Sequence, residues 1–264
     1  MAAFNVMEAT RFSYRLVWRE RRYFLYLAAI PCLIELICHM TVVMLGWRSM
    51  FMRQALIMLP SYFAYGWMLS HVARLVFLDQ RWPFRSTGNV ERDRRELDER
   101  ARHILAGMLS FVVVEFLLAG FMDGLYQLNT MPAPETAAAP SFPAAMIMAV
   151  FAGGLVWLFR YFWFYIPVSV GYPLPEFSMS MKGYGTSFYM MVVWLTCTAP
   201  VTMIYFFFVS TFVPVSPDGV PFTWSGEFIG AFTAALANTT IAILTTAGMA
   251  YGIRSMISTF QKNH

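Results

Sequence analysis

Residues 23–47 read YFLYLAAIPCLIELICHMTVVMLGW, and this stretch decides the fold class of the chain. It contains no Lys or Arg, and Glu35 is its one acid. A helix needs roughly 20 apolar residues to cross a hydrocarbon core about 30 Å thick. The stretch therefore predicts a transmembrane helix, on which Glu35 and His39 share one face because they stand four residues apart.

Similar stretches recur along the chain. They lie near 55–77, 104–126, 144–166, 188–213 and 227–251. Of the 264 residues, 58% are hydrophobic and 13% are charged, whereas soluble proteins carry about 25% charged residues. We therefore predict an all-α, polytopic integral membrane protein in which residues 1–264 form one domain of six transmembrane helices.

The basic residues are distributed unevenly about these spans. Of the 19 Lys and Arg residues, only Arg48 and Arg53 fall on the side opposite to all the others. Cytoplasmic loops carry the excess of Lys and Arg. This asymmetry predicts cytoplasmic N and C termini, and it explains the net charge of +4 without a nucleic-acid partner.

Residues 1–22 precede the first span. Arg11, Arg15, Arg19 and Arg22 form one stripe if this segment is helical. The pattern is typical of a cytoplasmic interfacial helix with its arginines among lipid phosphates. A plain basic anchor before the first span explains it equally well.

Residues 78–103 are the one strongly charged region of the chain. Opposite charges stand four residues apart in the pairs Glu91 and Arg95, Glu96 and Arg100, and Asp98 and Arg102. Such spacing favours a solvated, self-paired helix. Because nothing breaks a helix before the next span, we predict a charged cytoplasmic extension continuous with residues 104–126.

Aromatic residues surround Arg160 in the sequence VWLFRYFWFYIP, residues 156–167. Trp and Tyr favour the membrane interface, from which an arginine can reach lipid phosphates. We therefore predict an interfacial belt with Arg160 contacting lipid. A platform for stacking a ligand is the alternative.

Small residues recur every four positions in two spans. Gly226, Gly230 and Ala234 begin such a series in the last span, and Gly120 and Gly124 repeat it in the third. Small residues let helix backbones approach closely in lipid. We predict packing seams, either within the bundle or with a second copy or a partner in a membrane complex.

Three polar residues fall at similar depth. Glu35 and Glu115 each lie roughly 17 Å from the cytoplasmic start of their spans at 1.5 Å per residue, and Asn238 reaches a similar level from outside. His39 lies about one turn beyond Glu35. Because an acid at the centre of a span costs about 2.5–3.5 kcal/mol, it normally faces the bundle interior or water and has a partner.

This predicted midplane layer has three interpretations. It is a structural hydrogen-bond cluster that holds spans together, a path for protons or a solute, or a metal or haem site. One haem iron would need its two histidine ligands at one depth in the membrane, and the predicted depths of His39 and His71 differ too much. Cys32, Glu35 and His39 could ligate a metal only if one helix supplied all three ligands, so we predict no metal and no cofactor.

Two stretches carry a resemblance to a known class. They are FSYRLVWRERRYFLYLAAIP, residues 12–31, and RYFWFYIPVSVGYPLPEFSMSMKGYG, residues 160–185. Both resemble a class of bacterial inner-membrane proteins that includes the six-helix membrane domain of some glycerophosphoryl diester phosphodiesterases. Met181 and Lys182 replace the usual Trp and Arg, and the chain contains no phosphodiesterase domain. The resemblance implies six helices in the cell inner (cytoplasmic) membrane and transfers no activity.

The sequence contains no hydrolase elbow, phosphate-binding glycine loop, zinc-protease helix or paired-cysteine motif. We therefore expect a non-enzymatic, multi-pass membrane protein that organises the membrane, acts as a scaffold or serves as an accessory subunit. Its expected partners are the lipid bilayer and a second copy or a membrane complex. The alternative is a small secondary transporter or proton-coupled carrier that uses Glu35 and Glu115.

Overall fold

The computed structural model of the chain describes residues 5–47, 50–84, 86, 88–130, 153–154, 156–181, 183–212 and 224–262. Within these ranges the regular structure is entirely helical, which confirms the predicted all-α class. In chain order the elements are α1 (Val6–Arg19), α2 (Arg21–Leu45), α3 (Phe51–Leu78), α4 (Val90–Thr130), the 3-10 helix η1 (Phe159–Trp163), α6 (Tyr165–Ser169), α7 (Leu174–Ser180), α8 (Tyr184–Phe212) and α9 (Trp224–Lys262).

Four helices of the described part are long and apolar enough to cross a membrane. They comprise α2, residues 90–124 of α4, all of α8, and residues 224–259 of α9. The helix α3 is also long, with 28 residues, but it is not among these four. It contacts α2, α4, α6 and α9, and its second half is almost wholly buried. Because its neighbours cover α3, its side chains need not be as apolar as those of a helix that faces lipid.

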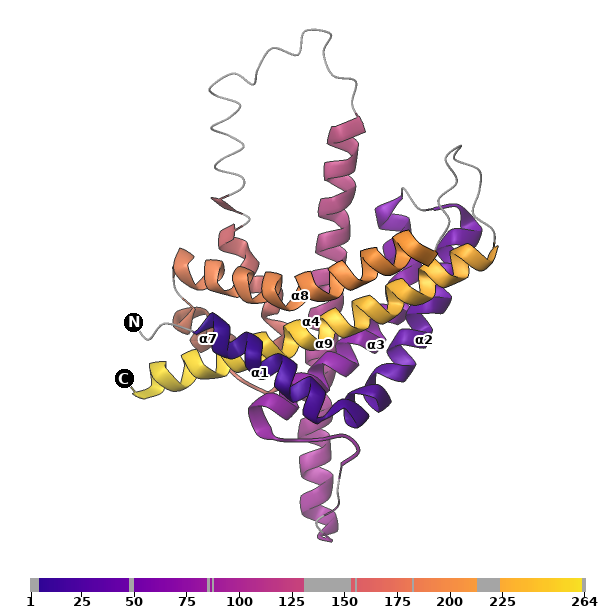
Figure 1. Ribbon diagram of the computed structural model, residues 1–264. Helices are drawn as coiled ribbons and strands as arrows, with labels where there is room; N and C mark the ends of the chain where they lie inside the picture. The colour runs from indigo at the N-terminus through magenta and orange to yellow at the C-terminus, as the bar shows by residue number, and fades with distance from the viewer. Residues whose placement is uncertain are drawn as a thin grey trace.

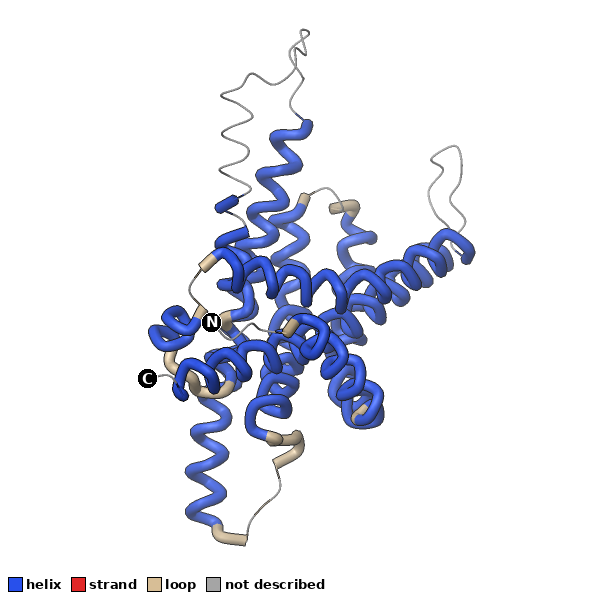
Figure 2. Tube along the Cα trace, turned by 60° about the vertical axis from the view of Figure 1, so that its left-hand side comes forward, coloured by secondary structure: helices blue, strands red, loops and turns tan. Residues whose placement is uncertain are grey.

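Figure 1 shows α4 running upright through the molecule, with α8 and α9 side by side across it and α2 and α3 to one side. In Figures 1 and 2 the charged end of α4 projects below the other helices. The helix is unbroken from Val90 to Thr130, so the predicted extension does continue into the predicted span at 104–126.

The extension is not self-paired as predicted. None of its three expected pairs forms an ion pair within 4.0 Å in the described part of the chain. Instead the preceding loop braces it: Ser86 donates a hydrogen bond to Asp93 at 2.6 Å, and Arg100 donates to the carbonyl of Arg81 at 2.7 Å. Asp93 and Arg100 are buried as a result. Charge spacing alone could not reveal this fold-back loop.

The N-terminal helix α1 packs against other helices of the protein. Its buried face comprises Ala9, Ser13 and Leu16, which repeat at helical spacing. The Ser13 hydroxyl donates to the carbonyl of Leu244 in α9 at 2.6 Å, and α1 also contacts α8. The four predicted stripe residues Arg11, Arg15, Arg19 and Arg22 are exposed.

Two glycines allow α3 and α4 to cross closely. A Cβ added to Gly66 would lie 2.9 Å from the Cα of Met108, and one added to Gly107 would lie 2.6 Å from Oγ of Ser70 and 2.7 Å from Cβ of Ser169. Contacts this short cannot be accommodated without movement of the backbone or of packed side chains. The crossing therefore requires glycine at both positions.

The glycines of the predicted packing seams do not make such close contacts. A Cβ at Gly124 or Gly230 would meet no atom within 4 Å, and one at Gly120 would meet only Sδ of Met52, at 3.7 Å. Gly226 is buried and Ala234 is half-buried. The periodic stripe thus does not identify the close crossing inside the bundle, because Gly66 and Gly107 do not belong to it.

The predicted span at 144–166 lies largely outside the described residues. Its described inner end is not one regular helix, because η1 occupies Phe159–Trp163 and the short α6 follows. Pro167 explains the change: its ring would clash with the carbonyl four residues earlier, at Trp163, in a continuous α-helix.

Several arginines cap helix ends inside the protein. Carbonyls in the last turn of a helix lack intrahelical partners, and cations stabilise that end. Guanidinium groups supply partners at three such carbonyls: Arg74 to Ser169 at 2.8 Å, Arg254 to Val76 at 2.7 Å, and Arg160 to Met181 at 2.6 Å.

Arg160 was predicted to contact lipid, but the structure places it inside the protein. It is only 6% exposed, and its guanidinium lies over the rings of Trp157 at 4.4 Å and Tyr161 at 4.8 Å. The aromatic residues therefore enclose the cation within the protein. A planar guanidinium can donate to a carbonyl and stack on aromatic rings at the same time, as Arg160 does here.

The crossing of α3 and α4 yields a stability prediction. Gly66→Ala and Gly107→Ala are each expected to destabilise the protein by ~1–3 kcal/mol, because the added methyl overpacks the crossing. The matched control Gly230→Ala is expected to stabilise it by about 0.5–1 kcal/mol, since alanine favours helix and the site is open. Unfolding of the purified protein in detergent, followed by near-UV circular dichroism, measures both. Equal effects at the three sites would contradict the assignment of the crossing.

Candidate functional site

The buried carboxylate of Glu35 is the centre of the candidate site. The inward face of α2 comprises Phe24, Leu27, Pro31, Glu35, Cys38 and Val42, which follow one another at spacings of three or four. Glu35 therefore occupies a position that the helix period turns toward α3 and α9. It is 4% exposed, so its oxygens depend on partners within the protein.

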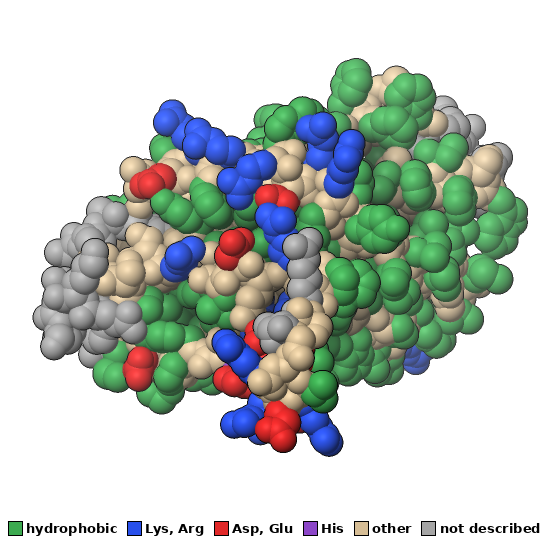
Figure 3. Space-filling view, turned by 90° about the horizontal axis from the view of Figure 1, so that it is seen from below, with side chains coloured by type: hydrophobic (Ala, Val, Ile, Leu, Met, Phe, Trp, Pro, Cys, Tyr) green, Lys and Arg blue, Asp and Glu red, His purple; other side chains and the backbone are tan. Residues whose placement is uncertain are grey.

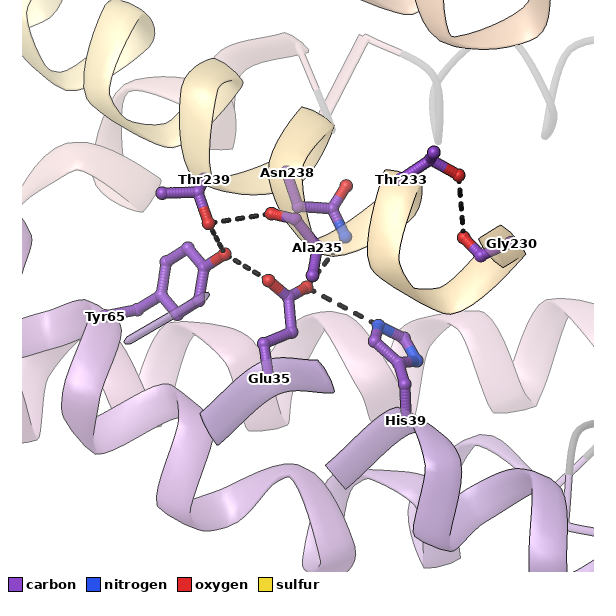
Figure 4. A network of polar contacts seen from close by, with 8 residues as sticks. All are labelled: Glu35, His39, Tyr65, Gly230, Thr233, Ala235, Asn238 and Thr239. Atoms are coloured by element: carbon purple, nitrogen blue, oxygen red, sulfur yellow. Dashed lines mark hydrogen bonds and ion pairs between the residues drawn. The ribbon is translucent and has the colours of Figure 1, made fainter. Parts of the chain in front are cut away.

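Three helices supply those partners (Figure 4). The Tyr65 hydroxyl of α3 donates to Oε2 of Glu35, and Nδ2 of Asn238 in α9 donates to Oε1 at 2.8 Å. His39, one turn along α2, places Nε2 3.4 Å from the same Oε1. The carboxylate thus joins α2, α3 and α9 directly.

A row of hydroxyl groups extends the site. The oxygens of Tyr65 and Thr239 lie 2.6 Å apart, and Thr239 donates to the carbonyl of Ala235 at 2.7 Å. Each hydroxyl has one hydrogen. Because Tyr65 donates its hydrogen to Glu35, the single hydrogen of Thr239 has two acceptors within reach, the Tyr65 oxygen and the carbonyl of Ala235.

The structure brings together three of the four residues predicted for the midplane layer. Glu35, Asn238 and His39 meet, whereas Glu115 stands on α4 as a half-buried side chain. Within the described ranges Glu115 makes no hydrogen bond or ion pair, although it interacts electrostatically with Glu35. Tyr62 of α3 interacts electrostatically with both acids. The second carboxylate is therefore a neighbour of the cluster and not one of its hydrogen-bonded members.

Sequence reasoning missed Tyr65 and Thr239. Tyrosines and threonines are common in apolar spans, so neither residue type stands out there. The available signal was position: Tyr65 precedes Gly66, and Thr239 follows Asn238. Recognising that Gly66 marks a helix crossing would have placed Tyr65 near the bundle interior.

The chemistry of the site is that of hydrogen bonding. No three His, Cys, Asp or Glu side chains in the described ranges are grouped so as to hold a metal ion. Two hollows of the described surface lie elsewhere, one lined by residues of α4 and the other at the α1–α2 corner. The cluster therefore links helices and carries exchangeable hydrogens. Neither of these two hollows adjoins it.

Comparison with protein-family models, curated proteins and solved structures gives no match for the chain. The role of the site must therefore be argued from its geometry.

The hydrogen bonds at Glu35 yield a prediction. Glu35→Gln is expected to retain stability, because its side-chain oxygen can accept from Asn238 and its amide can donate to the Tyr65 oxygen once the Tyr65 hydroxyl turns toward Thr239. Glu35→Leu is expected to cost ~1–2 kcal/mol, since it leaves both groups without their partner. Thermal unfolding in detergent compares the two variants. If Glu35→Gln were as destabilising as Glu35→Leu, a neutral hydrogen-bonding side chain would not be sufficient at position 35.

Proposed function

We propose that the protein is a non-enzymatic accessory or organising subunit of a larger assembly in the cell inner membrane. It would span the membrane six times with both termini in the cytoplasm. The observation that carries the proposal is a contrast between the interior and the outer faces of the bundle. Inside, the polar groups around Glu35 bind one another across three helices, whereas a Cβ at the exposed Gly124 or the half-buried Gly230 would meet no atom of the described residues within 4 Å.

The open positions suit a second helix. In lipid, helices associate by close van der Waals packing at small residues, because there is no hydrophobic drive between apolar surfaces. Helix α8 also presents a large apolar surface, with Met203, Ile204 and Phe207 each about 70% exposed. An exposed apolar surface can be covered by lipid as well as by a protein partner. We therefore use the glycines, and not the apolar surface, to identify a face that binds a partner helix.

The arrangement of helix ends supports the proposed topology. In Figure 1 the α2–α3 corner, the end of α4 at Thr130 and the facing ends of α8 and α9 lie toward the top and right. The chain termini and the charged end of α4 lie toward the left and bottom. Figure 3, which looks at the charged end, shows Arg and acidic side chains gathered on one part of this face and a broad apolar area beside them.

A second candidate is proton handling, the transport alternative raised by the sequence. The observation that favours it is the row of hydroxyls and acid from Thr239 to Glu35, which continues to His39. The His39 side chain is 35% exposed, so it connects a buried acid to the outside of the bundle. Acids in such series act as relays in transporters.

Co-purification tests the accessory role. Full-length protein extracted in mild detergent should carry a stoichiometric membrane partner or a second copy of itself. Gly124→Leu and Gly230→Leu should each reduce that association at least fivefold, because the side chains fill the open backbone. Ala29→Leu, at an exposed small residue of α2, is the matched control and should leave it unchanged. Equal association of all three variants would show that the surfaces at Gly124 and Gly230 do not bind the partner.

Liposome flux tests the alternative. Purified protein is reconstituted with a pH-sensitive dye inside the vesicles, and Glu35→Gln is compared with wild type. The accessory role predicts no proton flux above protein-free vesicles for either. Flux that Glu35→Gln abolishes, with unfolding unchanged, would overturn the accessory role in favour of a proton-coupled carrier.

A further inference from the structure

A hollow on α4 is lined by charged side chains and a histidine that have no part in the proposed function. It has a volume of about 340 Å³ and is lined by Arg95, Glu99, Arg102 and His103. Their spacing places all four on one face of the helix. The volume is at the lower end of the range for small-molecule sites, which suits a headgroup and not a whole lipid.

The charged side chains of this hollow do not pair with one another, although Glu99 acts electrostatically on Arg74. Glu99 forms no ion pair within 4.0 Å with Arg95 or Arg102 in the described part of the chain. Arg102 makes one long hydrogen bond, from Nε to the carbonyl of Asp98 at 3.4 Å. Arg95, Glu99 and Arg102 are all exposed. Two cationic groups and one anionic group therefore remain open to a ligand.

One wall of the hollow is held in place by the turn at Gly171. That glycine has a φ of +79°, and a Cβ built on it would lie 2.6 Å from Cε1 of His103. A side chain at position 171 would thus displace the imidazole, and the backbone conformation also favours glycine. The close approach fixes His103, while the arginines remain free to adjust around a ligand.

The hollow lies at the boundary between polar and apolar parts of α4. His103 directly precedes Ile104, the first residue of the apolar run. In a membrane this boundary is at the level of lipid headgroups, where phosphates meet Arg side chains. Position and chemistry therefore point to the same class of ligand.

We propose that this hollow binds a phosphoethanolamine group, with the phosphate on Arg95, Arg102 and His103 and the ammonium on Glu99. Arginine matches phosphate oxygens through charge-assisted hydrogen bonds, and a primary ammonium can donate hydrogens to a carboxylate. A glycerol headgroup has no cation for Glu99, and a choline headgroup has no N–H to donate. The inference goes beyond the accessory role and does not depend on it.

Lipid competition measured by native mass spectrometry tests this site. Full-length protein is released from nanodiscs containing equal amounts of phosphatidylethanolamine, phosphatidylglycerol and phosphatidylcholine. Wild type should retain phosphatidylethanolamine at least fivefold over either competitor. Combined Arg95→Gln and Arg102→Gln should remove this excess, and Glu99→Gln should shift retention toward phosphatidylglycerol. The matched control Arg94→Gln, on the same extension but outside the hollow, should behave as wild type.

Titration with soluble ligands distinguishes the source of the group. Saturable binding of free phosphoethanolamine in detergent, with no preference among lipids in the nanodiscs, would support the site with a soluble ligand. Equal binding of inorganic phosphate would overturn the role of Glu99 and with it the proposal. Equal retention of the three lipids with no soluble binding, in variants that unfold at the wild-type temperature, would overturn it entirely.

Discussion

The close crossing of α3 and α4 is the constraint on which the rest of the structure depends. Gly66 and Gly107 let the two backbones meet, and this contact places α3 in the centre with α2, α6 and α9 around it. Tyr65 precedes Gly66 directly, so the crossing also fixes the position of the hydroxyl that donates to Glu35. A side chain at either glycine would move the helix that carries the central hydrogen bond.

Much of the fold was predictable because lipid restricts the possible structures. A chain with long apolar stretches must satisfy its backbone hydrogen bonds in helices, so the all-α class and most helix positions followed from hydropathy. The meeting of Glu35 and Asn238 followed from counting depth. What could not be predicted was lateral position: residues at one depth need not face each other, and Glu115 stands apart from the hydrogen-bonded group.

Residue type alone also misled at the arginines and glycines. A count of basic residues treats every arginine as a charge near the membrane surface, but Arg74 and Arg160 are buried and bind carbonyls near helix ends. The regular glycine stripe suggested packing, yet the crossing uses isolated glycines. In both cases the decisive fact is which atom the residue meets, which requires the three-dimensional structure.

The unbroken helix α4 has a mechanical consequence. Its 41 residues form a rod about 60 Å long, at 1.5 Å per residue, and the glycine crossing with α3 holds it part of the way along. Because α4 is continuous and also packs against α3 and α6, its charged end and its far end are held at a constant separation by one helix. The same element therefore sets the position of both ends relative to the bundle.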